Sequence, residues 1–177
     1  METYKSNPFI FSSWMLLDSF HYCTECEDEG AHLIAGIDIE GIDNFSTGIG
    51  TRLITFPYAD KSIAHAQGLH HSTQKITIDA YEGSHRILAL IHSHPGNGTW
   101  SNYPSLTDLN TQRLWEYTTR MIGGIWSRDG YLRFFSYQMP FKVYIEGSHL
   151  EKVSKYVYKL KEQYLIATSL QQNQLAM

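Results

Sequence analysis

The 177-residue sequence predicts one domain of the α/β (α+β) class, with a mixed β-sheet flanked by helices. Two observations predict it. Helical and strand-like segments alternate in the order helix, strands, helix, strands, helix, and no repeat or shift in composition divides the chain. At this length a single core can bury roughly 70% of the surface that the unfolded chain exposes. The chain therefore has enough residues to fold around one core.

The first helix is expected between residues 12 and 30. Ser12 or Ser13 can cap its N-terminus, because a serine hydroxyl accepts a hydrogen bond from a free backbone N–H group of the first turn. Apolar residues then recur near the 3.6-residue period and predict one buried face: Trp14, Leu16, Leu17, Phe20 and Cys23. Gly30 is expected to lie beyond the end of this helix.

Strands and loops are expected after this helix. The apolar run 31–39 lies between glycines and predicts a buried strand. A glycine-rich turn at 48–50 precedes a second strand over 52–56. Residues 58–72 predict a loop or a broken helix, and 74–80 alternate apolar and polar side chains as a half-buried strand does.

The second half begins with the continuous aliphatic run 87–91, which is typical of a strand buried on both faces. A helix is expected over 105–120. An Asp-Gly dipeptide then joins the strand-like segments 121–127 and 131–137 as a hairpin, and 141–145 is expected to add a third strand to that meander.

A final helix is expected near the end of the sequence. Its apolar residues follow alternating spacings of three and four: Leu150, Val153, Val157, Leu160 and Tyr164. We therefore expect a main domain over 1–147, followed by a C-terminal amphipathic helix and tail over 148–177.

Composition narrows the classes of function. A net charge of −4 argues against nucleic acid and anionic membranes as main partners, although four arginines could cluster: Arg113, Arg120, Arg128 and Arg133. The apolar stretch from Phe9 to Phe20 fits neither a secretory signal nor a membrane span, so we expect a cytoplasmic protein. Cys23 and Cys26 are too few for a disulfide framework, and we expect both to be buried thiols.

The segment His92-Ser93-His94-Pro95 follows the buried aliphatic run and is the strongest indication of a functional site in the sequence. Residues two apart on a strand point to the same face, so His92 and His94 can converge on one metal ion. Asp108 can supply a carboxylate if the next helix begins over the end of the strand. Two imidazoles, one carboxylate and a water form a plausible catalytic zinc set. Taken alone, however, Ser105 and Asp108 have the spacing of an ordinary helix capping arrangement.

His92-Ser93-His94-Pro95 followed by Ser105-Leu106-Thr107-Asp108 resembles the zinc motif of the JAMM, or MPN-plus (Mov34/PAD1-like), metalloproteases. The family also has a glutamate before a strand, and Glu29 with Leu33 and Gly36 matches that pattern. The resemblance implies an MPN/JAB-like mixed sheet, similar to the cytidine deaminase sandwich. It also implies one Zn²⁺ per chain, with His92, His94 and Asp108 as ligands.

The resemblance further implies Glu29 as the general acid and base and Ser105 as a stabiliser of the oxyanion. Three other glutamates lie nearby, and Glu29 is preferred for its spacing to the strand: the others are Glu25, Glu27 and Glu40. His32, on the same strand, is expected to be a buried structural histidine.

One departure from the family pattern concerns the loop after His94. Ten residues, 95–104, separate His94 from Ser105, whereas the family usually has about seven. The extra residues are rich in Gly and Asn, so the loop is expected to bulge outward without moving the ligands. Trp100 and Tyr103 would then lie at the rim of the cleft and wall a substrate groove, or else pack locally under the loop.

The resemblance implies a zinc-dependent isopeptidase or peptidase that cleaves after the C-terminal glycine of a ubiquitin-like modifier, in deconjugation or precursor processing. The short chain looks like a prokaryotic branch found with bacterial ubiquitin-like conjugation systems, including antiviral (Bil-type) operons. Expected partners are the modifier and its conjugates, with activating and conjugating enzymes. Alternatives are processing of a sulfur-carrier ubiquitin-like protein, hydrolysis of a nucleic acid, and a catalytically silent MPN scaffold.

Overall fold

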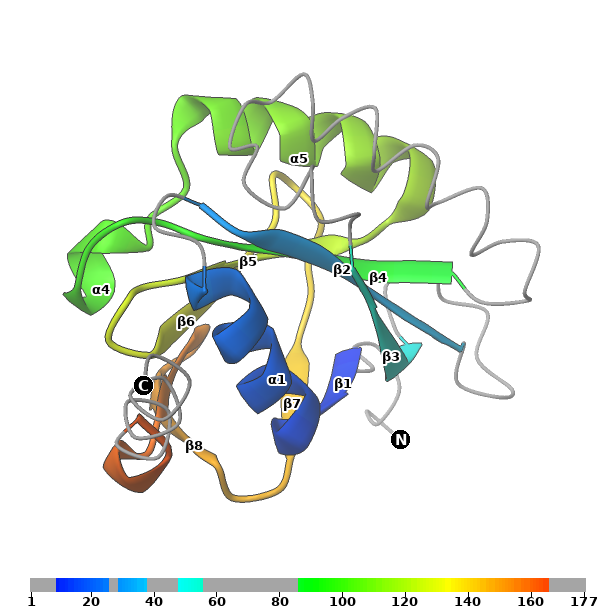
Figure 1. Ribbon diagram of the computed structural model, residues 1–177. Coiled ribbons are helices and arrows are strands. Elements are labelled where there is room, and N and C mark those ends of the chain that lie inside the picture. Colours follow the sequence, from blue (N-terminus) through cyan, green and yellow to red (C-terminus); the bar gives the residue numbers. More distant parts are fainter. Residues whose placement is uncertain (1–8, 26–28, 38–47, 56–85, 166–177) are drawn as a thin grey trace.

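The computed structural model describes residues 9–25, 29–37, 48–55 and 86–165 (Figure 1). The elements, in chain order, are β1 (Phe9–Ser12), α1 (Ser13–Thr24), β2 (Ala31–Ile37), β3 (Gly48–Thr55), β4 (Arg86–Ser93), α4 (Gly98–Ser101), α5 (Leu106–Thr119), β5 (Ile122–Trp126), β6 (Tyr131–Phe135), β7 (Val143–Glu146), β8 (Leu150–Ser154) and β9 (Val157–Leu160). The expected class, a mixed sheet flanked by helices, is confirmed. The expectations for 58–72 and 74–80 lie outside the described residues.

The described strands form one mixed sheet of nine strands in the order β7-β1-β3-β2-β4-β5-β6-β9-β8. Its two edge strands, β7 and β8, are joined by only three residues, 147–149, so the sheet must curl to bring its ends together. Side chains from the two ends meet: the Phe11 and Phe134 rings stack at 5.6 Å, and the Tyr158 hydroxyl donates to the Val143 carbonyl at 3.4 Å. The curled sheet encloses one core around α1 (Figure 1).

Helix α1 confirms the expected helix and most of its buried face. Leu16, Leu17, Phe20 and Cys23 lie in the core, but the Trp14 side chain is 64% exposed, so its expected burial is wrong. Two serines, Ser13 and Ser19, are buried on this helix instead. A serine can be buried at low cost where its hydroxyl has a partner, and here Ser13 Oγ lies 2.6 Å from His149 Nδ1.

The central strands β2, β4 and β5 carry the candidate site. β4 is antiparallel to β2 and parallel to β5, and the expected aliphatic strand over 87–91 is confirmed as fully buried. α1 covers one face of these strands and α5 the other (Figure 1). Trp115 of α5 packs in the second core cluster, with Leu33 and Leu90 of the sheet. Both faces are therefore apolar, as the run of aliphatic residues requires.

The hairpin of β5 and β6 is confirmed, but the expected third strand of the meander is wrong. β7 pairs in parallel with β1, at the other end of the sheet, and β9 takes the place beside β6. β1 itself, which no sequence pattern indicated, provides the partner for β7. Local sequence did not indicate this pairing, because it joins segments more than 130 residues apart.

The expected amphipathic helix over 148–177 is wrong in the part that the structure describes. Residues 150–160 form the β8–β9 hairpin with a turn at 155–156, and only 162–165 are helical. Val153, expected on the buried face, is 53% exposed. The segment is rich in Val and Tyr, which favour strands. β5 pairs with only one edge of β6, and β9 pairs with the other. Residues 166–177 lie outside the described part.

The expected turn at 48–50 is also wrong, because β3 begins at Gly48 and includes Gly50. The two glycines serve packing: a Cβ atom on Gly48 would lie 2.6 Å from a Leu88 methyl carbon, and one on Gly50 would lie 2.9 Å from the Phe11 ring. Glycine therefore lets the core side chains approach the β3 backbone. None of the described helices is long and apolar enough to cross a membrane.

Candidate metal centre

At the end of β4, two histidines lie on one face of the strand, and Ser93, between them, is hydrogen-bonded on the other face. Ser93 is fully buried: its hydroxyl donates to the Cys23 carbonyl at 3.1 Å and accepts the Gly30 N–H at 3.0 Å. His92 and His94 point the opposite way, and their Nε2 atoms lie 3.1 Å apart. The expected alternation along the strand is thus confirmed.

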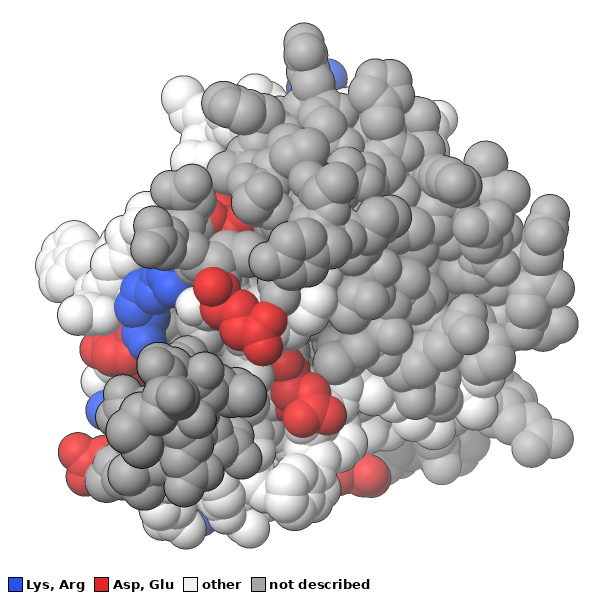
Figure 2. Space-filling model, viewed as in Figure 1, with Lys and Arg blue, Asp and Glu red and all other residues white. Residues whose placement is uncertain are grey.

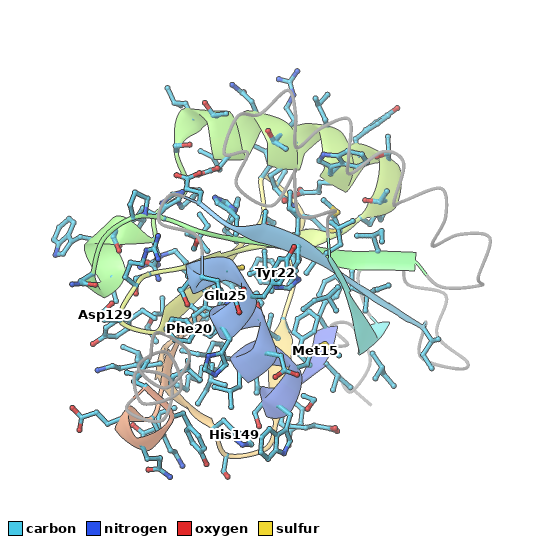
Figure 3. The ribbon with its side chains drawn as sticks, viewed as in Figure 1. Met15, Phe20, Tyr22, Glu25, Asp129 and His149 are labelled. Carbon is cyan, nitrogen blue, oxygen red and sulfur yellow. The ribbon has the colours of Figure 1, made fainter. Side chains whose placement is uncertain are left out.

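Glu29 reaches the same place from the start of β2. Ala31 pairs with His92 across the β2–β4 ladder, which places the residues just before β2 beside the histidines. Gly30 permits this approach, because a Cβ atom there would lie 2.4 Å from the Cys23 carbonyl oxygen. Glu29, His92 and His94 offer ligand atoms that all lie within 4.8 Å of one another. Glu25, one of the other glutamates considered, is exposed at the end of α1, and Glu27 and Glu40 lie outside the described residues (Figure 3).

Asp108 completes the cluster from the first turn of α5. Its Oδ1 lies 3.1 Å from His92 Nε2, and its Oδ2 lies 3.2 Å from His94 Nε2. The side chains of these three residues are only 10–15% exposed. The structure therefore brings together the four side chains that the sequence nominated as metal ligands and general base.

Ser105 and Asp108 form a capping box at the N-terminus of α5. Ser105 Oγ accepts the Asp108 N–H at 3.1 Å, and Asp108 Oδ2 accepts the Ser105 N–H at 2.7 Å. The capping interpretation is confirmed, and it coexists with the contacts to the histidines. Capping fixes the Asp108 carboxylate, and a fixed carboxylate is what a metal site needs from a helix terminus.

The His94 ring is oriented by the loop that follows it. Its Nδ1 lies 2.7 Å from the Ser101 carbonyl oxygen. A carbonyl can only accept, so Nδ1 carries a proton and the Nε2 lone pair of the neutral ring faces the cluster. Ser101 belongs to α4, within the expanded loop. The loop thus holds a ligand instead of merely bulging outward, a role that no sequence signal indicated because it uses a backbone carbonyl.

The charges of the cluster favour a cation. Burial alone would raise the pKa of the Asp108 carboxyl, but hydrogen bonds with His92 and His94, the charge of His92 and the hydrogen bond from the Ser105 N–H hold that pKa well below its usual range. Burial opposes protonation of His94, yet its hydrogen bonds to Asp108 and Ser101, with the charges of Asp108 and Glu29, raise its pKa above 6.5. A metal cation would occupy the position where the His94 Nε2 proton otherwise sits.

The donor set and its spacing fit zinc. A tetrahedral zinc ion with ligand bonds of about 2.0 Å has ligand atoms about 3.3 Å apart. The two histidine Nε2 atoms lie 3.1 Å apart, and each lies near a different oxygen of Asp108: His92 is 3.1 Å from Oδ1, and His94 is 3.2 Å from Oδ2. Imidazole nitrogens and a carboxylate are ligands that zinc uses in catalytic sites. Glu29, His92 and His94 offer ligand atoms that could hold a metal ion, and the Asp108 carboxylate lies against both histidines as a further candidate ligand.

The two aromatic residues of the expanded loop lie differently. Trp100 is 88% exposed, whereas Tyr103 is 54% exposed and lies beneath the Arg133 guanidinium, 3.9 Å from its ring centroid. Their rings are 6.3 Å apart. Tyr103 thus packs locally in part, while Trp100 projects into solvent. The groove that they were expected to wall stays a prediction.

His32 is a buried structural histidine, as expected. Its Nδ1 donates to the Leu33 carbonyl at 3.1 Å and its Nε2 accepts the Ser19 hydroxyl at 2.6 Å, while Trp126 Nε1 donates to the same hydroxyl at 2.9 Å. Tyr22 approaches the ring edge-on, with the ring centroids 5.8 Å apart. Burial lowers the pKa of His32 to about 4. Its polar atoms have partners, and the ring takes no part in the cluster.

The fold and the cluster together define a mixed α+β protein with a candidate metal centre at the end of β4. No family model and no curated protein sequence matches the chain. Among solved structures, a JAB1/MPN domain protein from Archaeoglobus fulgidus is similar at 15% identity with a TM-score of 0.47, over 77% of this chain and 98% of that one. The solution structure of a Desulfitobacterium hafniense protein is similar at 12% identity with a TM-score of 0.52, over 79% of this chain and 94% of that one. At such identities the likeness to the second structure concerns the fold alone.

Proposed function

We propose that the protein is a zinc-dependent isopeptidase or peptidase that cleaves after the C-terminal glycine of a ubiquitin-like modifier. The observation that carries the proposal is the convergence of His92, His94 and Asp108 on one point, with the Glu29 carboxylate beside it. The family resemblance of these same positions supplies the substrate class. A bacterial, antiviral conjugation pathway is the proposed setting, and the activating and conjugating enzymes of that pathway are the proposed partners.

Each residue of the cluster has a distinct role in the proposed reaction. Glu29 accepts a proton from the attacking water and returns it to the leaving amine, so it acts as general base and then as general acid. A zinc ion held by His92, His94 and Asp108 would supply Lewis acidity, which lowers the pKa of water and polarises a carbonyl.

Ser105 can serve the reaction without giving up its structural role. Its oxygen accepts the Asp108 N–H through a lone pair, so the hydroxyl proton is available to a developing oxyanion. The side chain is exposed at the N-terminus of α5, next to the ligand that the helix contributes. We therefore propose Ser105 as the oxyanion donor, in addition to its capping role.

The expanded loop provides the proposed contact with substrate. Trp100 and Leu106 are 88% and 81% exposed, and they lie on either side of Tyr103 in the sequence between two ligands, His94 and Asp108. Large apolar side chains in water stabilise a complex when a partner covers them. We propose that this surface contacts the substrate chain next to the scissile bond.

The experiment is a cleavage assay on a fusion of a ubiquitin-like protein to a reporter. Purified protein loaded with zinc should cut after the terminal glycine, and a chelator or Glu29→Gln should abolish the cut. Glu25→Gln is the matched control, because it changes a neighbouring glutamate at the end of α1. Cleavage that survives Glu29→Gln contradicts the assignment of the base, and a zinc-loaded protein that leaves every such fusion intact contradicts the substrate class.

The alternatives predict different results. A sulfur-carrier protease would cut only fusions of a sulfur-carrier protein, and genes for thiamine or molybdopterin synthesis next to this one would favour it. A silent scaffold would bind no zinc. It is disfavoured because all four positions of the motif are filled and brought together.

Acidic charge on one described face disfavours nucleic acid as the substrate. On the face seen in Figure 2, acidic side chains gather over the region of α1, where Asp18 and Glu25 are exposed. Two of the arginines that could have formed a basic cluster are used in separate contacts within the protein. Arg128 donates to the Thr24 carbonyl at 2.8 Å, and Arg133 donates to the Asn102 side chain at 3.1 Å.

A further inference from the structure

We propose that Asp129 is a positioning residue for the metal centre, acting through α4 on the ring of His94. The inference rests on the proposed metal centre and assigns a function to the expanded loop. Asp129 touches neither the ligands nor Glu29 through any hydrogen bond or ion pair of the described residues. Its effect is transmitted by the backbone of 98–101, which connects its carboxylate to the carbonyl that holds His94.

The first link is the contact between His94 and Ser101. The His94 backbone is fixed, because its N–H donates to the Trp126 carbonyl at 2.9 Å. The ring can still rotate, and the 2.7 Å hydrogen bond from Nδ1 to the Ser101 carbonyl selects one orientation and one tautomer. A metal-ligating histidine commonly requires such a partner on its second nitrogen. The position of the Ser101 carbonyl therefore governs how well Nε2 faces the other ligands.

The second link is the attachment of α4 to the β5–β6 hairpin. α4 has only four residues, so it cannot be stable without tertiary contacts. Asp129 Oδ1 accepts the N–H of Gly98, the first residue of α4, at 2.8 Å. Asp129 is itself fixed by the Ser127 hydroxyl, which donates to the same oxygen at 2.6 Å. Figure 3 shows Asp129 beside α4.

A second attachment lies just after Ser101 and limits the motion that remains. Asn102 is fully buried: its Nδ2 donates to the Tyr131 carbonyl at 3.3 Å, and its Oδ1 accepts from Arg133 Nε at 3.1 Å. Two further contacts come from the hairpin: the Arg128 N–H donates to the Gly96 carbonyl at 2.7 Å, and Arg133 Nη2 donates to the Thr99 carbonyl at 3.4 Å. Asp129 is the side chain that holds the first N–H of α4, and Asn102 holds the end of the helix, so the Ser101 carbonyl lies between them. Asp129 is the better residue to test, because it is only partly buried.

The test compares metal binding by the full-length protein and its variants. Zn²⁺ affinity is measured by competition with a chromophoric chelator, and the ligand geometry is read from the visible absorption of the Co²⁺-loaded protein. Asp129→Ala should weaken Zn²⁺ binding by up to about 10-fold, the low end of the range for a direct partner of a ligand, and change the Co²⁺ spectrum. Asp129→Asn should restore both, because its side-chain oxygen can still accept the Gly98 N–H.

The controls separate this role from general stability. Glu151→Ala removes one acidic charge from an exposed position of β8, at an edge of the sheet, and should leave affinity and spectrum unchanged. Thermal unfolding of the metal-free variants verifies folding, and if Asp129→Ala does not fold, Asp129→Ser replaces it. Wild-type affinity and spectrum in the folded alanine or serine variant overturn the role of Asp129. A wild-type protein that binds neither Zn²⁺ nor Co²⁺ overturns the metal centre itself, and the two failures are thereby distinct.

Discussion

The buried histidine of β2 should make the stability of the fold depend on pH in a defined window. His32 is fully buried and neutral, and burial lowers its pKa from 6.5 to about 4. A base with a lowered pKa in the folded state stabilises the fold above its unfolded pKa, and this contribution is lost as the pH falls from 6.5 towards 4. A difference of 2.5 units at about 1.4 kcal/mol each gives roughly 3 kcal/mol lost between pH 7 and pH 4.

The assay is urea unfolding of the metal-free protein at a series of pH values, beside the variant His32→Gln. Glutamine can accept the Ser19 hydroxyl with its carbonyl and does not titrate. Other groups that titrate, His94 and Asp108 among them, contribute equally to both proteins, so the difference in the free energy of unfolding isolates His32. We expect the free energy of unfolding of the wild type, relative to that of His32→Gln, to fall by about 3 kcal/mol from pH 7 to pH 4. Parallel stability curves for the two proteins would refute the reasoning.

Three further substitutions test the fold and the site. Glu116→Ala should cost about 2–4 kcal/mol in urea unfolding, because the carboxylate accepts the backbone N–H groups of 137–139, and a loss below 1 kcal/mol would contradict this role. Ser105→Ala should cost about 1 kcal/mol in stability and lower kcat by about 10²- to 10³-fold with zinc content unchanged; an unchanged kcat would exclude it as oxyanion donor. Trp100→Ala should change stability by less than about 0.5 kcal/mol but raise KM, and a normal KM would remove Trp100 from the substrate surface.

The sequence predicted the parts of the fold that local patterns determine. Helix α5 with its capping box, the β5–β6 hairpin and the aliphatic strand β4 each depend on a short segment, and each is confirmed. Pairing between distant segments could not be predicted in this way. The 3,4 spacing over 150–164 indicated a helix, yet the free edge of β6 makes this segment a hairpin, because tertiary pairing outweighs a weak helical preference.

The sequence likewise indicated some residues of the candidate site and not others. His92, His94 and Asp108 could be found because ligand spacing on a strand and a helix start is visible in the sequence. The groups that orient them could not. Ser101 acts through a backbone carbonyl, and Asp129 acts through the N–H of Gly98, 31 residues away, so neither contact has a sequence signature. The extra loop residues were expected to bulge outward without moving the ligands, whereas the folded loop holds the ring of His94.

Metal content tests the central claim most directly. Elemental analysis of the purified protein after reconstitution with Zn²⁺ and removal of excess metal should find about one zinc per chain. The double variant His92→Ala/His94→Ala should retain none, while His21→Ala, which changes a histidine of α1 outside the cluster, should retain the full amount. A wild-type protein that remains free of zinc after reconstitution, or a double variant that binds as much as wild type, would contradict the assignment of the metal centre.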